Sequence, residues 1–331
     1  MKKLYLITGA SGHLGYTLLK KLHAQKETIR VLVLPGEEMI VKDYAEVITG
    51  NVLDKESLRS FFDVSGYDSV TLIHAAAKIT IETKQDDSVW AINVEGTKNV
   101  MDLALENKIH RVIYVSSVHA IEEKKYPEII VEPTYFDKDK VYGQYAKSKA
   151  EAARVVLEYA KKGLPVSIVH PSGIIGPNDI FNRNHSVLTL KAMYKGTIPV
   201  ATSGGYDFVD VRDVVDGILA CEEKGRVGEC YLLTGEFISV KDMLNTILAL
   251  KNKKERNIIF PTAIAKVFAP LAEFFHGKLG NGKPILTKYS LYTLSSNVHF
   301  SHAKAEKELG YHPRDIKESI RDSIDVHYVK A

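Results

Sequence analysis

The sequence predicts an α/β fold in which a doubly wound parallel sheet is followed by a smaller, discontinuous C-terminal part. Through the first half of the chain, short apolar runs alternate with amphipathic helical stretches, which indicates repeated βα units and therefore parallel strands. The first apolar run leads directly into three glycines spaced three residues apart. Beyond residue 172, glycines and prolines separate shorter helical stretches, so a second and smaller part is expected there.

Buried strands are predicted from apolar runs rich in β-branched residues. They are Leu4–Thr8, Thr28–Leu34, Val47–Thr49, Ser69–His74, Arg111–Ser116 and Val166–His170. Amphipathic helices are predicted between them at about residues 13–24, 55–62, 88–107 and 143–162. Ligands of such a sheet bind at the carboxyl ends of its strands, so the residues that follow each strand are the candidates for function.

The turn between the first strand and the first helix carries Gly9, Gly12 and Gly15, a GxxGxxG spacing. Here the strand must stop abruptly, the backbone must approach a pyrophosphate closely, and the helix must offer free N–H groups to the phosphates. Glycine permits each step because it lacks a Cβ atom. The strand before the turn and the apolar helix after it favour nucleotide binding over a glycine-rich connection without a ligand.

The expected division of the chain is discontinuous. Residues 1–172 and 206–234 are expected to form a dinucleotide-binding core, and residues 173–205 and 235–331 a substrate-binding part. The second stretch of the core is assigned because Asp207–Val215 and Glu229–Thr234 are expected as a helix start and a strand that return to the main sheet.

The composition excludes several classes of function. With 331 residues and 45% hydrophobic content the chain can bury a large core. Its formal charge of +3 is spread without a basic run, so no nucleic acid or membrane partner is expected. Cys221 and Cys230 lack metal or redox spacing, so no metal site and a reducing compartment are expected. The apolar stretches are too short or too interrupted for a signal peptide or a membrane span, which favours a cytoplasmic protein.

A second motif, YxxxK, begins one of the predicted helices. Tyr145 and Lys149 are four residues apart and share a helix face, so the ammonium is expected to lower the pKa of the phenol from about 10. Ser117 directly follows a predicted strand, on the cofactor side of the sheet. Its hydroxyl can bond a carbonyl oxygen while the phenol transfers a proton, which predicts hydride chemistry at a carbonyl or alcohol. Tyr16 and Lys20 form another such pair, but Tyr16 is expected only to pack after the glycine turn.

Seven motifs in order resemble those of the extended short-chain dehydrogenases/reductases, the NAD-dependent epimerase/dehydratase superfamily, over nearly the whole chain. They are TGASGHLG, HAAA from His74, AINVEGT with Asn93, YVSSVHA with Ser117, YAKSK, HPSGIIGP from His170, and FVDVRDV from Phe208. HPSGIIGP and the ending KAEKELGYHPRDIKESIRDSI are similar to the dihydroflavonol-reductase-like and hydroxysteroid-dehydrogenase-like branch. The resemblance implies a Rossmann-like fold and an NAD(P) cofactor.

The resemblance also implies roles for single residues. Ser117 orients the carbonyl, Tyr145 transfers the proton, and Lys149 holds the nicotinamide ribose and tunes Tyr145. The implied cofactor-binding residues are Gly9, Ser11, Gly12, His13, Leu14, Gly15, Leu34, Asn51, Val52, His74, Ala75, Ala76, Asn93, Tyr145, Lys149, Pro171, Ser172 and Gly173.

The sequence departs from the family pattern where the cofactor is chosen. Relatives that use NADP often carry an arginine, and relatives that use NAD an acidic residue, where Leu34 ends the second strand. Asn51 stands for an aspartate near the adenine. Glu37 and Glu38 follow the strand and would repel a 2′-phosphate, with Lys42 the nearest cation in sequence. The balance leans slightly toward NAD.

The sequence therefore predicts an NAD(P)-dependent oxidoreductase that reduces a ketone or aldehyde of a small to medium, partly apolar substrate, or oxidises the matching alcohol. A sugar-nucleotide epimerase or dehydratase on the same fold is one alternative, although dehydratases carry an Asp-Glu pair where Val118 and His119 stand. A non-enzymatic NAD(P)-sensing regulator is the other, and the retained Ser, Tyr and Lys argue against it. His119 and His170 are expected to be surface or packing residues.

A homodimer is expected from the same resemblance. Relatives commonly pair the helices predicted at residues 88–107 and 143–162, and Val155, Val156 and Tyr159 are expected to give the latter helix apolar surface to bury.

Overall fold

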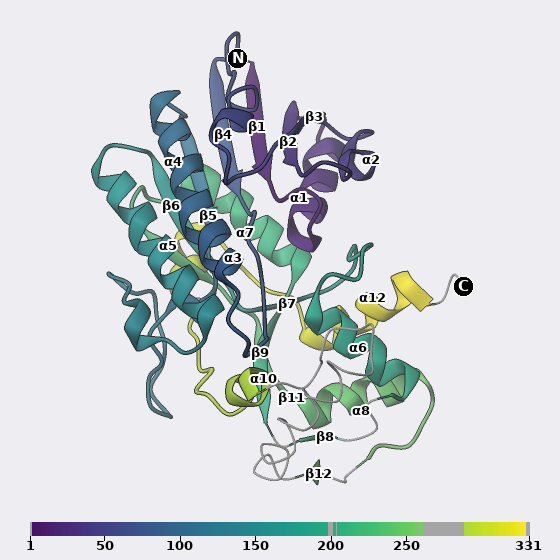
Figure 1. The fold of residues 1–331 in the computed structure, drawn as a ribbon. Coiled ribbons are helices and arrows are strands. Elements are labelled where there is room, and N and C mark those ends of the chain that lie inside the picture. Colours follow the sequence, from purple (N-terminus) through teal and green to yellow (C-terminus); the bar gives the residue numbers. More distant parts are fainter. Residues whose placement is uncertain (1, 198–200, 203, 257–258, 261–287, 329–331) are drawn as a thin grey trace.

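The computed structural model describes residues 2–197, 201–202, 204–256, 259–260 and 288–328. Its main sheet consists of β1 (Lys3–Thr8), β2 (Ile29–Val33), β3 (Glu46–Thr49), β4 (Ser69–His74), β5 (Arg111–Val115), β6 (Val166–Pro171) and β10 (Cys230–Leu233). Within the described residues these seven strands pair in parallel in the order β10-β6-β5-β4-β1-β2-β3 (Figure 1). The predicted fold class is confirmed, and the order reverses direction between β1 and β4, the place where such sheets bind ligands.

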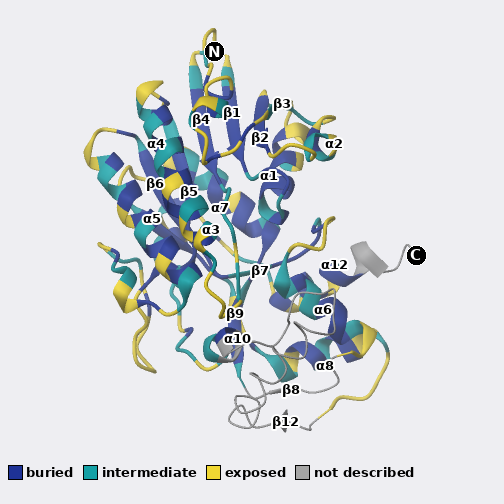
Figure 2. Cartoon of the chain, in the orientation of Figure 1, coloured by how far each residue is buried: buried dark blue, intermediate teal, exposed yellow. Residues whose placement is uncertain are grey.

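Helices cover both faces of the main sheet. The helices α1 (His13–Ala24) and α7 (Val211–Lys224) lie on one face, and α4 (Thr97–Glu106) and α5 (Gln144–Lys161) lie on the other (Figure 1). Side chains alternate along β1, so Leu4 and Leu6 join the core under α4 and α5, while Tyr5 and Ile7 join the core under α1 and α7. In Figure 2 the strands of this sheet are mostly dark blue, which shows that the core follows the sheet.

The smaller part lies beyond the carboxyl ends of the main strands (Figure 1). Its sheet has the order β11-β9-β7, from β7 (Gly173–Ile175), β9 (Gly205–Asp210) and β11 (Glu236–Ser239). The helices α6 (His185–Lys195), α8 (Val240–Leu250) and α12 (Ile316–Tyr328) share a separate apolar core with it. The remaining elements are α2 (Glu38–Val41), α3 (Asp87–Trp90), α10 (Lys288–Thr293), α11 (Ala303–Leu309), the pair β8 (Ala201–Thr202) and β12 (Ile259–Phe260), and the short turns η1 (Glu56–Leu58), η2 (Ala91–Gly96), η3 (Val118–Ala120) and η4 (Lys138–Lys140).

The helix predicted at residues 55–62 is wrong, because only the 3₁₀ turn η1 forms there. Short polar side chains bond neighbouring backbone groups instead. Asp54 accepts from the backbone N–H of Glu56 at 3.1 Å, and the Ser57 hydroxyl donates to the Asp54 carbonyl at 2.7 Å. Such local bonds compete with helix formation.

The helix predicted at residues 88–107 is three consecutive helical segments. It starts as α3, continues as the π-helical segment η2, and ends as α4. A π-helical segment changes which side chains face inward, and here it buries Asn93.

The return of the chain from the smaller part is partly as predicted. Residues 207–210 belong to β9, which pairs with β7 and β11, so this stretch extends the smaller sheet and does not return to the main one. α7 begins at Val211, after Asp210 accepts a hydrogen bond from the backbone N–H of Arg212. β10 does return and pairs with β6. The division into a core and a substrate-binding part stays a prediction.

The apolar surface expected for a dimer is already covered. Val155, Val156 and Tyr159 are 6%, 0% and 7% exposed and pack into the core beneath α4 and α5. These side chains therefore stabilise the monomer, and the homodimer stays a prediction without them. Among the described residues, no helix is long and apolar enough to cross a membrane.

Candidate active site

A cavity of about 900 Å³ opens at the carboxyl ends of the main strands and extends under the smaller part. Most residues predicted to bind the cofactor line it, and so does Ser117. They are Gly9, Ser11, Gly12, His13, Leu14, Gly15, Leu34, Asn51, Val52, Ala75, Ala76, Tyr145, Lys149, Pro171, Ser172 and Gly173. His74 and Asn93 lie outside the lining. Among the described residues, no group of three or more His, Cys, Asp or Glu side chains is placed to hold a metal ion.

The glycine turn packs too tightly for a side chain at Gly9 or at Gly15. Gly9 has a φ of +76°, and a Cβ on it would lie 2.7 Å from the backbone nitrogen of Ala76. A Cβ on Gly15 would lie 2.1 Å from the carbonyl oxygen of Gly9. α1 starts at His13 with no side chain capping its first turn, so its N–H groups are available to an anion. This cradle fits the diphosphate of a dinucleotide.

His74 lies directly beneath the turn and has a structural role. The Thr8 hydroxyl donates to its Nδ1 at 2.7 Å, and its Nε2–H donates to the Thr97 hydroxyl oxygen at 3.1 Å, since that hydroxyl itself donates to the Asn93 carbonyl. Burial lowers the pKa of His74 to about 3. The neutral ring thus links β1, β4 and α4, and the prediction that His74 contacts the cofactor is not supported by its position.

Asn93 also has a structural role and does not line the cavity. Its side chain accepts from the backbone N–H of Lys78 at 2.8 Å and donates to the Lys78 carbonyl at 3.0 Å. It further donates to the Ser148 hydroxyl at 2.9 Å. Asn93 therefore fixes the segment after β4 to α5, the helix that carries Tyr145 and Lys149.

Ser117 and Tyr145 are adjacent in the cavity. Ser117 has an extended backbone and accepts a hydrogen bond from the backbone N–H of His119 at 3.2 Å. Burial raises the pKa of Tyr145 to about 12, against a hydrogen bond with Ser117 that lowers it. The expectation that a neighbouring ammonium lowers this pKa is wrong for the structure, because burial dominates and the Lys149 amine donates to the Val115 carbonyl.

Lys149 carries a buried amine at the floor of the cavity. Its side chain is 2% exposed, and Nζ donates to the Val115 carbonyl at 2.8 Å. Among the described residues, no carboxylate forms an ion pair with it. Burial therefore lowers the pKa of Lys149 to about 7.

The two isolated histidines differ. His170 is fully buried against Phe136, and its Nδ1 lies 3.0 Å from the carbonyl of Ser117, so the prediction of a packing residue is confirmed. His119 lines the cavity beside Tyr145, with ring centres 6.0 Å apart, so the prediction of a surface or packing residue is wrong there. Nothing in the local sequence distinguishes the two.

An ion pair that the sequence does not predict lies near the glycine turn. Arg183, from the loop before α6, donates to Glu37 at 2.7 Å, and the Ser11 hydroxyl donates to the other carboxylate oxygen at 2.6 Å. Burial would raise the pKa of Glu37, but these two hydrogen bonds outweigh it and the pKa is lowered. Lys42 is the cation nearest to Glu37 in the sequence. The cation that pairs with Glu37 in the cavity wall is instead Arg183, which is 146 residues away in the sequence.

His13 joins the turn to the same loop. Its Nδ1 accepts from the Asn184 side chain at 2.9 Å, so its Nε2–H donates to the Pro177 carbonyl at 2.7 Å. Both nitrogens are thus used to hold the smaller part over the glycine turn.

Known proteins share this sequence pattern and architecture. Residues 5–233 match the model of the NAD dependent epimerase/dehydratase family. The chain is 27% identical to sterol demethylase protein B of Methylococcus capsulatus, over 96% of both chains. It is 27% identical to the 4-hydroxy-2-methyl-3-oxo-4-farnesyl-3,4-dihydroquinoline-1-oxide ketoreductase of Stigmatella aurantiaca, over 96% of this chain and 94% of the relative. The crystal structure of gox2253 superposes with a TM-score of 0.83 and 29% identity, over 99% of this chain and 98% of that one.

The buried amine of Lys149 predicts a stability effect that depends on pH. Its pKa is about 7 in the folded chain, against 10.5 for a lysine side chain in water, as in the unfolded chain. Between these two pH values the unfolded chain binds more protons than the folded chain, so the free energy of unfolding rises with pH there. Lys149→Met is expected to raise the free energy of unfolding without added cofactor at about pH 7, with a gain that shrinks toward about pH 10. Urea denaturation across this range measures it.

Lys147→Met is the matched control, because Lys147 is exposed on the same helix. Its difference from the wild type is expected to be small and independent of pH. A loss of stability in Lys149→Met at about pH 7 would contradict the account of the buried amine.

Proposed function

Since the chain belongs to the NAD dependent epimerase/dehydratase family, we propose that it is an NAD(P)-dependent oxidoreductase. It reduces a ketone or aldehyde of a small to medium, partly apolar substrate, or oxidises the matching alcohol. The observation that carries the proposal is the adjacent pair of Ser117 and Tyr145 in the cavity, with the amine of Lys149 beneath. A cytoplasmic location belongs to the proposal, in line with Cys221 and Cys230, which form no disulfide.

Each catalytic side chain has one role in this proposal. Ser117 donates a hydrogen bond to the substrate carbonyl and orients it. Tyr145 gives its phenolic proton to the carbonyl oxygen, and burial keeps that phenol protonated at neutral pH, which suits reduction. Lys149 holds the nicotinamide ribose from below. The nicotinamide, when bound, supplies the hydride.

The walls of the cavity favour an apolar carbonyl compound over a sugar nucleotide. The substrate side is lined by Ile79, Ile81, Ile174, Met193, Phe208 and Met243, among others. The lysines and arginines in the described lining are already engaged: Lys78 pairs with Asp86 at 2.7 Å, Arg183 pairs with Glu37, and Lys149 donates to a carbonyl. A substrate diphosphate would therefore have to displace one of these existing contacts. Two relatives, which are named a sterol demethylase protein and a ketoreductase, agree with this choice.

Sugar-nucleotide epimerisation or dehydration remains the alternative activity on this fold. The family name includes both reactions. These reactions and carbonyl reduction would use the same cofactor site. They are distinguished by the substrate that is converted and by whether the cofactor is oxidised in the net reaction.

Tyr145→Phe is expected to abolish turnover while leaving affinity for reduced cofactor nearly intact, because the phenol acts on the substrate and the glycine turn holds the phosphates. A turnover loss of roughly 10²–10⁴-fold is the size expected for acid/base catalysis. Lys149→Ala is expected to reduce both quantities. Steady-state rates and cofactor titrations measure them.

Tyr16→Phe is the control for the other YxxxK pair. The Tyr16 hydroxyl lies 3.5 Å from that of Tyr44, away from the cavity lining, so its loss is expected to be nearly silent. A Tyr145→Phe enzyme that keeps more than about a tenth of its activity would rule out the assigned role.

For the cofactor we propose a preference for NAD. Glu37 follows β2 about 20 residues after the glycine turn, where an acidic residue binds the ribose 2′-hydroxyl. The carboxylate is oriented by Ser11 and Arg183. A 2′-phosphate would meet this carboxylate and would have to displace it from Arg183.

Dissociation constants for NAD and NADP check this preference. Glu37→Gln removes the charge and frees Arg183, and Leu34→Arg adds a cation, so each is expected to shift the ratio toward NADP by about tenfold or more. Glu38→Gln is the matched control, because Glu38 loses the same charge outside the cavity lining. A wild-type protein that binds NADP about tenfold more tightly than NAD would refute the preference.

A further inference from the structure

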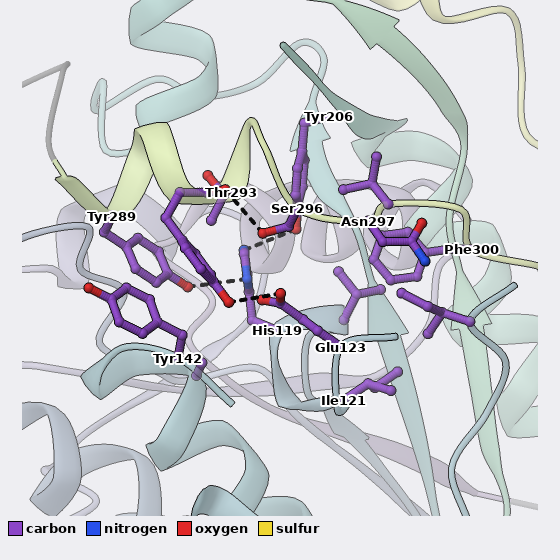
Figure 3. A pocket seen from close by; sticks show the side chains of 15 residues that line it. His119, Ile121, Glu123, Tyr142, Tyr206, Tyr289, Thr293, Ser296, Asn297 and Phe300 are labelled. Atoms are coloured by element: carbon purple, nitrogen blue, oxygen red, sulfur yellow. Dashed lines mark hydrogen bonds between the residues drawn. The ribbon is translucent and has the colours of Figure 1, made fainter. Parts of the chain in front are cut away.

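Three aromatic side chains from distant segments meet beside Tyr145. His119 lies in η3, Tyr206 in β9 and Tyr289 in α10, and Figure 3 shows the imidazole between the two phenols. The Tyr206 hydroxyl lies 3.1 Å from His119 Nε2, and the Tyr289 hydroxyl lies 3.2 Å from Nδ1. We name these three residues the Tyr-His-Tyr cluster.

The surroundings hold the cluster in one arrangement. Gly143, just before α5, has a φ of +93°, and a Cβ there would lie 2.5 Å from the Tyr289 ring. The Tyr206 ring stacks on His119 with centres 5.7 Å apart and contacts Phe208 edge-on at the same distance. Side chains fixed by packing in this way present their polar atoms in defined directions.

One phenolic O–H of the cluster has no hydrogen-bond acceptor within the cluster. Burial lowers the pKa of His119 to about 4, so the imidazole is neutral and has one N–H donor and one acceptor nitrogen. One phenol therefore donates to the ring, and the other accepts from it. The accepting phenol keeps its own O–H, whichever tautomer forms.

That O–H has no acceptor in the part of the chain that the structure describes. Neither phenol oxygen has a second partner there, although Tyr206 and Tyr289 are only 8% and 6% exposed. A buried donor without an acceptor is unfavourable, so a ligand atom or a water molecule in one of the adjoining cavities is expected to accept from this O–H.

Two cavities adjoin the cluster. All three residues line the large cavity, in which His119 lies beside Tyr145. They also line a side cavity of about 30 Å³, bounded by Ile121, Phe300 and others (Figure 3). The side cavity has room for a water molecule, whereas the large cavity admits a substrate with an apolar frame.

We propose that the Tyr-His-Tyr cluster is a second substrate contact, which donates one hydrogen bond to an acceptor oxygen of the substrate away from its reacting carbon. The cluster thereby selects carbonyl compounds that carry a second oxygen as a ketone, ether or hydroxyl group. This subsite rests on the proposed function, because it places the reacting carbonyl at Ser117 and Tyr145.

Matched ketones test the subsite. The probes are 1-tetralone, its 5-, 6- and 7-methoxy derivatives, which add one acceptor and no donor, and the corresponding ethyl derivatives, which match them in size. Dissociation constants are measured in the presence of NAD, with which a ketone cannot react, and kcat and KM with the reduced cofactor. At least one methoxy ketone is expected to bind about fivefold or more tightly than its ethyl counterpart.

Tyr206→Phe and Tyr289→Phe each delete one hydroxyl. At least one of them is expected to abolish the methoxy preference by raising KM for the methoxy ketone, while kcat for 1-tetralone changes less than about threefold. Tyr142→Phe is the control, because Tyr142 stacks on Tyr289 outside the large cavity. Thermal unfolding verifies that the variants fold.

The subsite would be overturned if the wild type bound every methoxy ketone and its ethyl counterpart equally. It would also be overturned if both cluster variants kept the methoxy preference, and that result would assign the free O–H to a water in the side cavity. Binding in the presence of NAD decides this without turnover. Failure to reduce any ketone with either cofactor would count against the proposed function alone.

Discussion

A chain of hydrogen bonds under the cavity floor positions the glycine turn relative to the helix that carries Tyr145 and Lys149. It runs from Thr8 at the end of β1 through His74 to Thr97, and from the carbonyl of Asn93 and its side chain to Ser148 in α5. One end therefore holds the strand that precedes the glycine turn, and the other holds the helix of Tyr145 and Lys149. Because the Thr97 hydroxyl donates to the Asn93 carbonyl, it can only accept from His74, so the other imidazole tautomer would break one of these two hydrogen bonds.

Burial governs the electrostatics of the site more than pairing does. Tyr145 and Lys149 both lie in a region of low polarity, which favours their neutral forms: the pKa of the phenol is raised to about 12 and that of the amine is lowered to about 7. A protonated phenol is ready to donate to a developing alkoxide. The helix-face argument places the two residues correctly on α5 but overestimates their mutual effect, since it includes no desolvation.

The sequence predicts the parts of the fold and site that depend on local pattern. The strands, the glycine turn, Ser117, Tyr145 and Lys149 each follow from residues that are neighbours in the chain. The role of His119 could not be predicted, because its partners Tyr206 and Tyr289 are 87 and 170 residues away. The ion pair of Arg183 could not be predicted for the same reason, because its partner Glu37 lies 146 residues away in the sequence. The error at residues 55–62 has a local cause, since polar side chains there bond the backbone in place of helical partners.

In the reaction that we propose for this chain, a hydride passes from the reduced cofactor to a carbonyl carbon. Reduction of 1-tetralone with cofactor deuterated at the transferring position of the nicotinamide tests it most directly. The account predicts deuterium at the carbinol carbon of the alcohol and one cofactor molecule oxidised per product molecule. Interconversion of a sugar nucleotide without net oxidation of the cofactor, together with no deuterium in any alcohol product, would contradict it.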